Sequence, residues 1–82
     1  MKTLTQLENE LSEIRKGVAK GQYQKGMFGL EECKKSIQWE MDFFKKDLCF
    51  LYTNYVTRGL NETGFNLIKI VACEEMMKEV RA

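Results

Sequence analysis

The chain has 82 residues, enough for one small domain, and its 44% apolar and 30% charged residues are typical of a globular protein. Its formal net charge of +1 gives no overall electrostatic preference for nucleic acid or for a membrane surface. Histidine is absent, and the three cysteines, Cys33, Cys49 and Cys73, lie far apart in the sequence. A zinc site is therefore not expected, and we expect reduced, buried thiols in a cytoplasmic protein that needs no cofactor.

Residues 3–20 are predicted to form the first helix. Its apolar residues recur at alternating steps of three and four, as along the seam of a coiled coil: Leu4, Leu7, Leu11, Ile14 and Val18. Thr3 and Gln6 are spaced as a capping box, and Gly21 is the expected end, with Gly17 as an earlier alternative. Two heptads are too few to be stable alone in water, so this helix must pack on others.

Residues 21–29 contain three glycines and are predicted to form a loop. Three large apolar residues lie on this basic segment: Tyr23, Met27 and Phe28. Two interpretations remain open for them. The loop folds back over the end of the bundle, or it presents these side chains as a contact surface, since binding residues concentrate on loops held by a scaffold.

Residues 30–58 are predicted to form a single long helix, because no glycine or proline interrupts them. Its main apolar stripe consists of Leu30, Cys33, Ile37, Met41, Phe44, Leu48, Leu51 and Tyr55. A second stripe consists of Trp39, Phe43 and Phe50. Within the main stripe, Phe44 and Leu48 are expected in the core. Gly59 suits the left-handed position just past a helix, and Asn61 suits the N-cap of the next one.

Residues 61–80 are predicted to form the third helix, joined to the long one as an αα-hairpin. The apolar run Leu67–Cys73, which includes Ile68 as an expected core residue, is also compatible with a buried strand. The length of the segment and its tail Glu74–Glu79, rich in helix-forming residues, favour a helix.

The length of the central helix leads to a prediction about association. A helix over residues 30–58 would be roughly 43 Å long, whereas a globule of this size is about 30 Å across. Either the helix breaks, most plausibly around Thr53–Asn54, or a second copy covers its overhanging end. The sequence thus predicts an elongated all-α bundle completed by homodimerisation. A monomeric three-helix bundle with a kinked middle helix and a complex with another protein are the alternatives.

Catalysis is not expected, because without histidine acid–base chemistry would depend on carboxylates, lysines or cysteines in no recognisable arrangement. The leading hypothesis is a small cytoplasmic protein–protein interaction module: an adaptor, regulator or inhibitor. Its candidate contact residues are Tyr23, Met27, Phe28, Trp39 and Phe43, because methionine and aromatic side chains anchor interfaces.

The alternative hypothesis is a regulatory protein that binds nucleic acid through residues 15–25. This segment carries Arg15, Lys16, Lys20 and Lys25 and no acidic residue, with Tyr23 interleaved. Such a pattern pairs phosphate contacts with base stacking. No pair of predicted helices shows helix-turn-helix spacing.

In its small size, its lack of proline and its richness in lysine and aromatic residues, the chain resembles small accessory proteins of bacteriophages. The resemblance rests on composition and on no motif. Many such proteins bind and block a host protein, so it implies an inhibitory interaction role.

Overall fold

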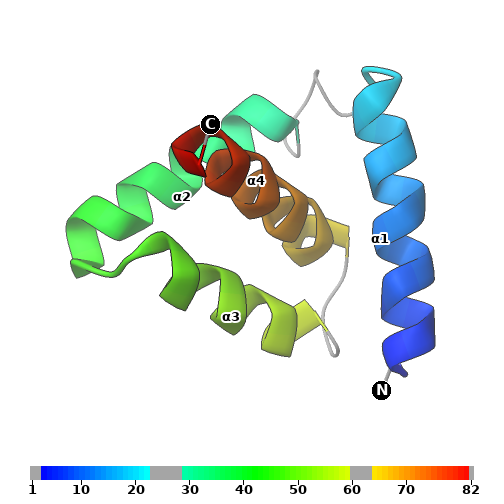
Figure 1. Ribbon diagram of the computed structural model, residues 1–82, viewed down its shortest axis with the longest axis horizontal. Coiled ribbons are helices and arrows are strands. Elements are labelled where there is room, and N and C mark those ends of the chain that lie inside the picture. The colour runs from blue at the N-terminus through cyan, green and yellow to red at the C-terminus, as the bar shows by residue number, and fades with distance from the viewer. Residues whose placement is uncertain (1–2, 23–28, 60–63, 82) are drawn as a thin grey trace.

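Three helices are arranged around the middle of a fourth (Figure 1). The computed structural model describes residues 3–22, 29–59 and 64–81. Within them the helices are α1 (Leu4–Ala19), α2 (Leu30–Phe44), α3 (Leu48–Gly59) and α4 (Gly64–Arg81). The all-helical prediction is confirmed for these residues, but the described chain forms four helices and not three.

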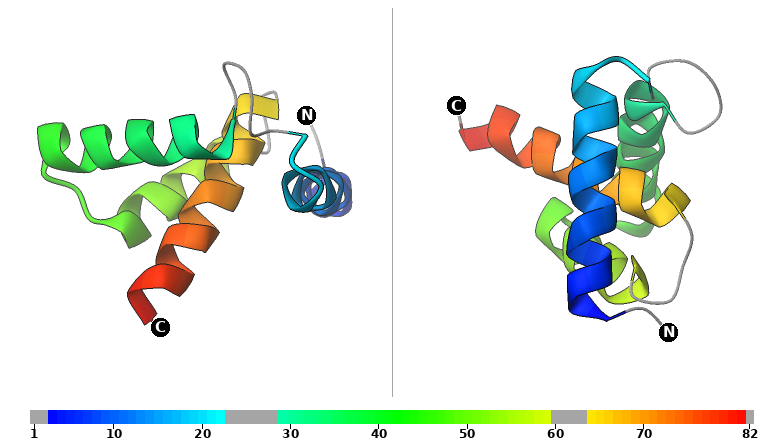
Figure 2. Two further views of the ribbon diagram at one scale, coloured as in Figure 1. Left: turned by 90° about the horizontal axis from the view of Figure 1, so that it is seen from above. Right: turned by 90° about the vertical axis from the view of Figure 1, so that its right-hand side faces the viewer.

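Helix α4 lies between the α2–α3 hairpin and α1, as both Figure 1 and Figure 2 show. All seven residues of Leu67–Cys73 are buried, so this part of α4 is covered on every side. A helix can bury consecutive residues, here six apolar ones and Lys69, when its neighbours cover its whole circumference. The prediction of a helix rather than a strand is confirmed here. The C-terminal residues 78–81 are exposed.

The single long helix predicted over residues 30–58 is wrong, because the chain turns at Lys45–Asp47. Lys45 adopts a left-handed conformation with φ of 52°. The Lys46 N–H donates to the Met41 carbonyl at 3.2 Å, the six-to-one bond of a Schellman motif. The Asp47 carboxylate then accepts the Phe50 N–H at 2.6 Å and caps α3. The alternative break around Thr53–Asn54 is also wrong, since both residues lie inside α3.

The turn removes the overhang on which the predicted homodimer depended. Folded as a hairpin, the segment fits a molecule with extents of 31 × 27 × 26 Å. Its radius of gyration of 12.2 Å is close to the value of about 12 Å expected for a lone chain of this length. The structure therefore gives no support to dimerisation as a way of covering a protruding helix.

Helix α1 follows its predicted limits closely. The Thr3–Gln6 capping box is present, with the two N–H···O distances at 2.9 and 3.2 Å. Gly21, with φ of 80°, ends the helix, and the Gln22 N–H donates to the Gly17 carbonyl at 2.8 Å. Gly17 is buried inside the helix and does not end it. The seam packs inward through Leu7, Leu11 and Ile14.

Gly59 is the buried last residue of α3 and is not in the left-handed region, so its predicted role as a left-handed cap is wrong. It allows a close approach of helices instead. A Cβ atom there would lie 3.1 Å from Ile70 Cδ1 and 3.4 Å from Leu7 Cδ1. The lack of a side chain thus lets α3 pack tightly against α4 and α1. The predicted cap at Asn61 lies outside the described residues.

Candidate protein interaction surface

A cluster of exposed aromatic residues lies on the α2–α3 hairpin. Its members, which we call the aromatic patch, are Trp39, Phe43, Phe44 and Phe50, with exposed fractions of 59, 65, 54 and 51%. The Trp39 and Phe43 rings stack with centroids 4.9 Å apart and an interplanar angle of 12°. Phe44 meets Phe43 edge-on, also at 4.9 Å. The three rings of α2 therefore form one continuous apolar surface.

Two local features place this patch outside the core. Trp39 and Phe43 are four residues apart and so lie on one face of α2, while Cys33 and Ile37 of the same helix are buried. Phe44 is the last residue of α2, directly before the turn. Its predicted core position assumed an uninterrupted helix and is wrong. The predicted core position of Ile68 is confirmed, and Leu48 is partly buried against the core.

Phe44 and Phe50 also line a hollow of about 340 Å³ between α2 and α3, which we call the α2–α3 hollow. Its remaining lining residues are Glu40, Lys46, Leu51, Asn54, Tyr55 and Arg58. Leu51 and Tyr55 are buried and form its floor, whereas Lys46 and Arg58 are exposed at its rim. The hollow thus has aromatic walls, an apolar floor and a cationic rim.

The carboxylate of Glu40 is bound by two residues that lie beneath the hollow. Lys69 of α4 is only 7% exposed, and its Nζ lies 3.4 Å from Glu40 Oε1. The Tyr55 hydroxyl also donates to Glu40. The Lys69 ammonium lies 5.1 and 4.7 Å from the ring centroids of Tyr55 and Phe65, where ring faces attract a cation. This cluster joins α2, α3 and α4 beneath the hollow and fixes the position of its floor.

The rim cations have a different environment. Lys46 Nζ lies 4.7 Å from the Phe50 ring centroid. Within residues 3–22, 29–59 and 64–81, neither Lys46 nor Arg58 forms an ion pair. Because Glu40 is paired with Lys69, the surface around the hollow carries an excess of positive charge.

Comparisons with models of protein families, with curated proteins and with solved structures find no match to this chain. The site must therefore be interpreted from its own geometry.

Of the five contact residues predicted from the sequence, Trp39 and Phe43 belong to the aromatic patch. Tyr23, Met27 and Phe28 lie outside the described residues. Phe44, Phe50 and the rim cations were not predicted as contacts, because their proximity depends on the turn. Asp47, a good N-cap three residues before Phe50, is the signal that could have located that turn.

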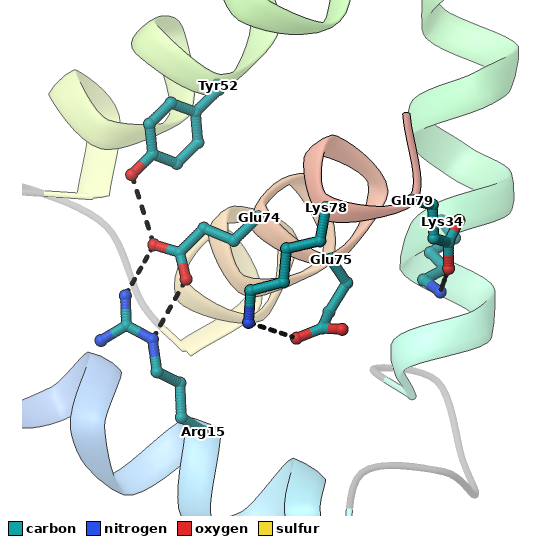
Figure 3. A network of polar contacts seen from close by, with 7 residues as sticks. All are labelled: Arg15, Lys34, Tyr52, Glu74, Glu75, Lys78 and Glu79. Carbon is teal, nitrogen blue, oxygen red and sulfur yellow. Dashed lines mark hydrogen bonds and ion pairs between the residues drawn. The ribbon is translucent and has the colours of Figure 1, made fainter. Parts of the chain in front are cut away.

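The predicted nucleic-acid segment contains a residue that serves the fold. Arg15 contacts Glu74 of α4 through two hydrogen bonds, of 3.1 Å from Nε and 2.6 Å from a terminal nitrogen. Tyr52 of α3 donates to the same carboxylate at 3.3 Å, so the three residues join three helices (Figure 3). The hydrogen bond to Glu74 raises the pKa of the Arg15 guanidinium. Lys16 pairs with Glu13 at 3.4 Å, Lys20 is exposed, and Lys25 lies outside the described residues.

The thiols offer no activated nucleophile in the core. Burial raises the pKa of Cys33 to about 11 and that of Cys73 to about 12, so both are protonated and unreactive near neutral pH. Cys49 is exposed and lines a second hollow of about 450 Å³ beside Met41, Met76 and Met77. The residues that the structure describes include no group of three or more histidine, cysteine or acidic side chains placed to hold a metal ion. None of their helices has the length and apolarity needed to cross a bilayer.

Proposed function

We propose that this protein is a non-catalytic interaction module that binds another protein through the aromatic patch. The supporting observation is where its aromatic side chains lie. The single tryptophan of the chain and three of its five phenylalanines are exposed on one hairpin. Tyr55 is the one buried aromatic side chain of the described core, whose other members are aliphatic apart from Cys33, Cys73 and Lys69.

Such a surface supplies binding free energy when a partner covers it. Burying a phenylalanine side chain stabilises a complex by about 1.5–3 kcal/mol, and tryptophan is among the residues most enriched at interface hot spots. The stacked rings of Trp39 and Phe43 already restrict each other. Less side-chain entropy is therefore lost on binding than for isolated, freely rotating side chains.

Two further parts of the proposal are the absence of catalysis, which is argued from the core, and a blocking role, which is argued from the composition. Lys69 and Glu40 are committed to each other, which supports a role without catalysis. A blocking role in the cytoplasm, like that of the phage accessory proteins that the chain resembles in composition, is part of the same proposal. An apolar patch can also bind a second copy of the same chain. Homodimerisation through this surface is therefore the first alternative to test.

The nucleic-acid alternative receives less support from the geometry. Its segment contains Arg15, whose guanidinium is bound to Glu74, and Lys16, which is paired with Glu13. A phosphate would have to compete with both carboxylates.

Affinity capture tests the proposal. The full chain is immobilised and exposed to an extract of its native cells, and the bound protein is identified by mass spectrometry and then purified. The double variant Trp39→Ala/Phe43→Ala should weaken the interaction about a hundredfold, because the loss of about 1.4 kcal/mol at each aromatic anchor corresponds to a factor of ten. Titration calorimetry measures the change.

A matched control uses an exposed apolar residue elsewhere. Leu4 on α1 is 66% exposed, so Leu4→Ala removes a comparable surface contact outside the patch and should leave the affinity unchanged. Circular dichroism confirms that each variant is folded. Undiminished affinity of the Trp39→Ala/Phe43→Ala variant would exclude the patch as the binding surface. Sedimentation equilibrium of the isolated chain determines whether a second copy is the partner.

A further inference from the structure

The α2–α3 hollow beside the aromatic patch has a shape and a charge that select one kind of partner segment. We propose that it binds an acidic amphipathic helix of a partner protein. Apolar side chains of that helix would fill the hollow, and its carboxylates would pair with Lys46 and Arg58. This inference rests on the proposed function and specifies the chemistry of the partner.

The walls and floor of the hollow fit apolar side chains. Phe44 and Phe50 face the same space of about 340 Å³, above the buried side chains of Leu51 and Tyr55. This volume lies within the usual range of about 300–1,000 Å³ for sites that enclose a ligand group. One polar side chain of the floor, Tyr55, already donates its hydroxyl proton to Glu40. The floor therefore requires no polar group from the ligand.

The rim determines the charge of the partner. Lys46 and Arg58 line the hollow and form no ion pair with any described residue. Glu40 is neutralised by Lys69, whereas Asp47, which accepts the backbone N–H of Phe50, keeps its charge and does not line the hollow. An acidic segment would supply the missing counter-charges, whereas a basic one would add like-charge repulsion.

The structure surrounding the hollow favours a helix as the bound segment. The described residues contain no β-strand, so they offer no sheet edge to which an extended peptide could add a strand. The hollow lies between two helices joined at one end (Figure 1). A groove between helices accommodates the side-chain ridge of a third helix, with anchors spaced at three, four and seven residues.

The ring geometry favours a peptide over single-stranded nucleic acid. Binding of bases requires accessible ring faces on which they can stack. The Trp39 and Phe43 rings cover one face of each other, and Lys46 Nζ lies over the Phe50 ring. At most one face of each of these three rings stays open, so the patch offers fewer stacking surfaces for bases than separate rings would.

Selection from a peptide library tests the inference with the full-length protein as the target. The library encodes helical peptides with an apolar face at fixed positions and flanking positions that vary among Glu, Gln and Lys. We expect the enriched peptides to be acidic at the flanks. Their binding is measured through the emission of Trp39, the single tryptophan of the chain, which should shift to the blue when the patch is covered.

Charge reversal locates the contact. The variant Lys46→Glu/Arg58→Glu should bind an enriched acidic peptide about tenfold or more weakly, because two attractive pairs become repulsive. Exchanging the glutamates of the peptide for lysines should restore binding to this variant. Arg58→Glu alone should show a smaller loss, and it leaves the Lys46–Phe50 contact in place. Lys16→Glu/Lys20→Glu on α1 is the matched control and should bind as the wild type does.

The outcomes separate this inference from the proposed function. If neutral or basic peptides bind through Trp39 and Phe43, the proposal of an acidic helix is wrong, whereas the proposal of an interaction module is unaffected. Failure to enrich any peptide whose binding depends on those two residues would contradict the acidic helix, whereas the proposed function is contradicted only by undiminished affinity of the Trp39→Ala/Phe43→Ala variant for the captured protein. If oligothymidine binds more tightly than the peptides and the variant Lys46→Glu/Arg58→Glu abolishes this binding, the ligand of the hollow would be a nucleic acid and not a helix.

Discussion

Lys69 is the one charged side chain buried in the described core. It is tolerated because Glu40 pairs with its ammonium group at 3.4 Å and two aromatic rings lie beside it. Every buried side-chain nitrogen and oxygen of the described residues has a hydrogen-bond partner. Ionic groups of this kind are costly to separate, because removing one partner leaves the other desolvated and uncompensated.

The two partners should respond differently to mutation. Glu40→Gln leaves the nearly fully buried Lys69 without a counter-charge and should lower the free energy of unfolding by about 3 kcal/mol. Lys69→Met leaves a carboxylate that is one-quarter exposed and still accepts from Tyr55, so its cost should stay below about 1 kcal/mol. Urea unfolding of both variants measures the difference. Equal costs would show that the pair is not desolvated as the structure indicates.

The buried thiols make stability depend on alkaline pH. In the folded chain the pKa values of Cys33 and Cys73 are about 11 and 12, against an ordinary value of 9.0. Below pH 9 both states keep the protons, so stability is unaffected. Above it, the unfolded chain releases protons that the folded chain retains, and the free energy of unfolding falls by about 1.4 kcal/mol per thiol and pH unit.

We therefore expect stability to decline as the pH rises from 9 through about 11 to 12. The double variant Cys33→Ala/Cys73→Ala isolates the thiol contribution, because the tyrosines and lysines that titrate in this range are unchanged. Its stability should fall less steeply than that of the wild type when urea midpoints are followed between pH 8 and 11. Parallel plots of urea midpoint against pH for the two proteins would show that the buried thiols do not cause the decline.

At the scale of secondary structure, three residues between α2 and α3 determine the shape of the molecule. Lys45 ends α2 in a left-handed conformation that costs an L-residue roughly 1–2 kcal/mol. Asp47 begins α3 through its bond to the Phe50 N–H. The hairpin that results places Leu51 and Tyr55 against α4 and separates Phe44 from the core. The turn thus creates both the surface of α3 that packs against α4 and the exposed surface that carries Phe44.

Mutations at this turn should change stability in opposite directions. Lys45→Gly removes the left-handed strain and should stabilise the fold by about 0.5–1 kcal/mol. Asp47→Ala removes the cap and should destabilise it by about 1 kcal/mol, while Asp47→Ser should retain most of the stability. Lys46→Gly, at a position without positive φ, should bring no gain. Thermal unfolding followed by circular dichroism measures all four variants, and a loss of stability in Lys45→Gly would contradict the described turn.

At the scale of the whole molecule, α4 is the centre of the core. It is covered by α1, α2 and α3 of the same chain, and the ion pairs Arg15–Glu74 and Lys34–Glu79 join it to α1 and α2 at its periphery (Figure 3). Folding should therefore require no second copy, even if copies associate through the exposed patch.

This independence can be measured. We expect the urea midpoint to stay constant over a hundredfold range of protein concentration, since only association coupled to folding makes it vary. Tyrosine fluorescence extends the measurement to low concentration. A midpoint that rises with concentration would show that a partner chain completes the core.

The sequence alone determined the features that depend on neighbouring residues. The helical class, the capping box at Thr3, the end of α1 at Gly21 and the helical state of Leu67–Cys73 were all predicted, because periodicity and caps act over one or two turns. Trp39 and Phe43 were identified as contact candidates for a similar reason: they lie off the main apolar stripe of α2. Their function in binding stays a prediction.

Asp47 is a local signal for a cap, but only the tertiary structure decided that the central segment turns there and which aromatic side chains are left outside. Lys45 carries no sequence signal for a left-handed residue, and the strain it bears is offset by the packing of α3 against α4. The same packing encloses Leu51 and Tyr55 while leaving Phe44 exposed, although all three share one predicted stripe. The central segment could locally form either a continuous helix or a turn, and the burial of residues distant in the sequence selects the turn. The free energy of that burial comes from contacts between helices, so it cannot be assigned to any short stretch of residues.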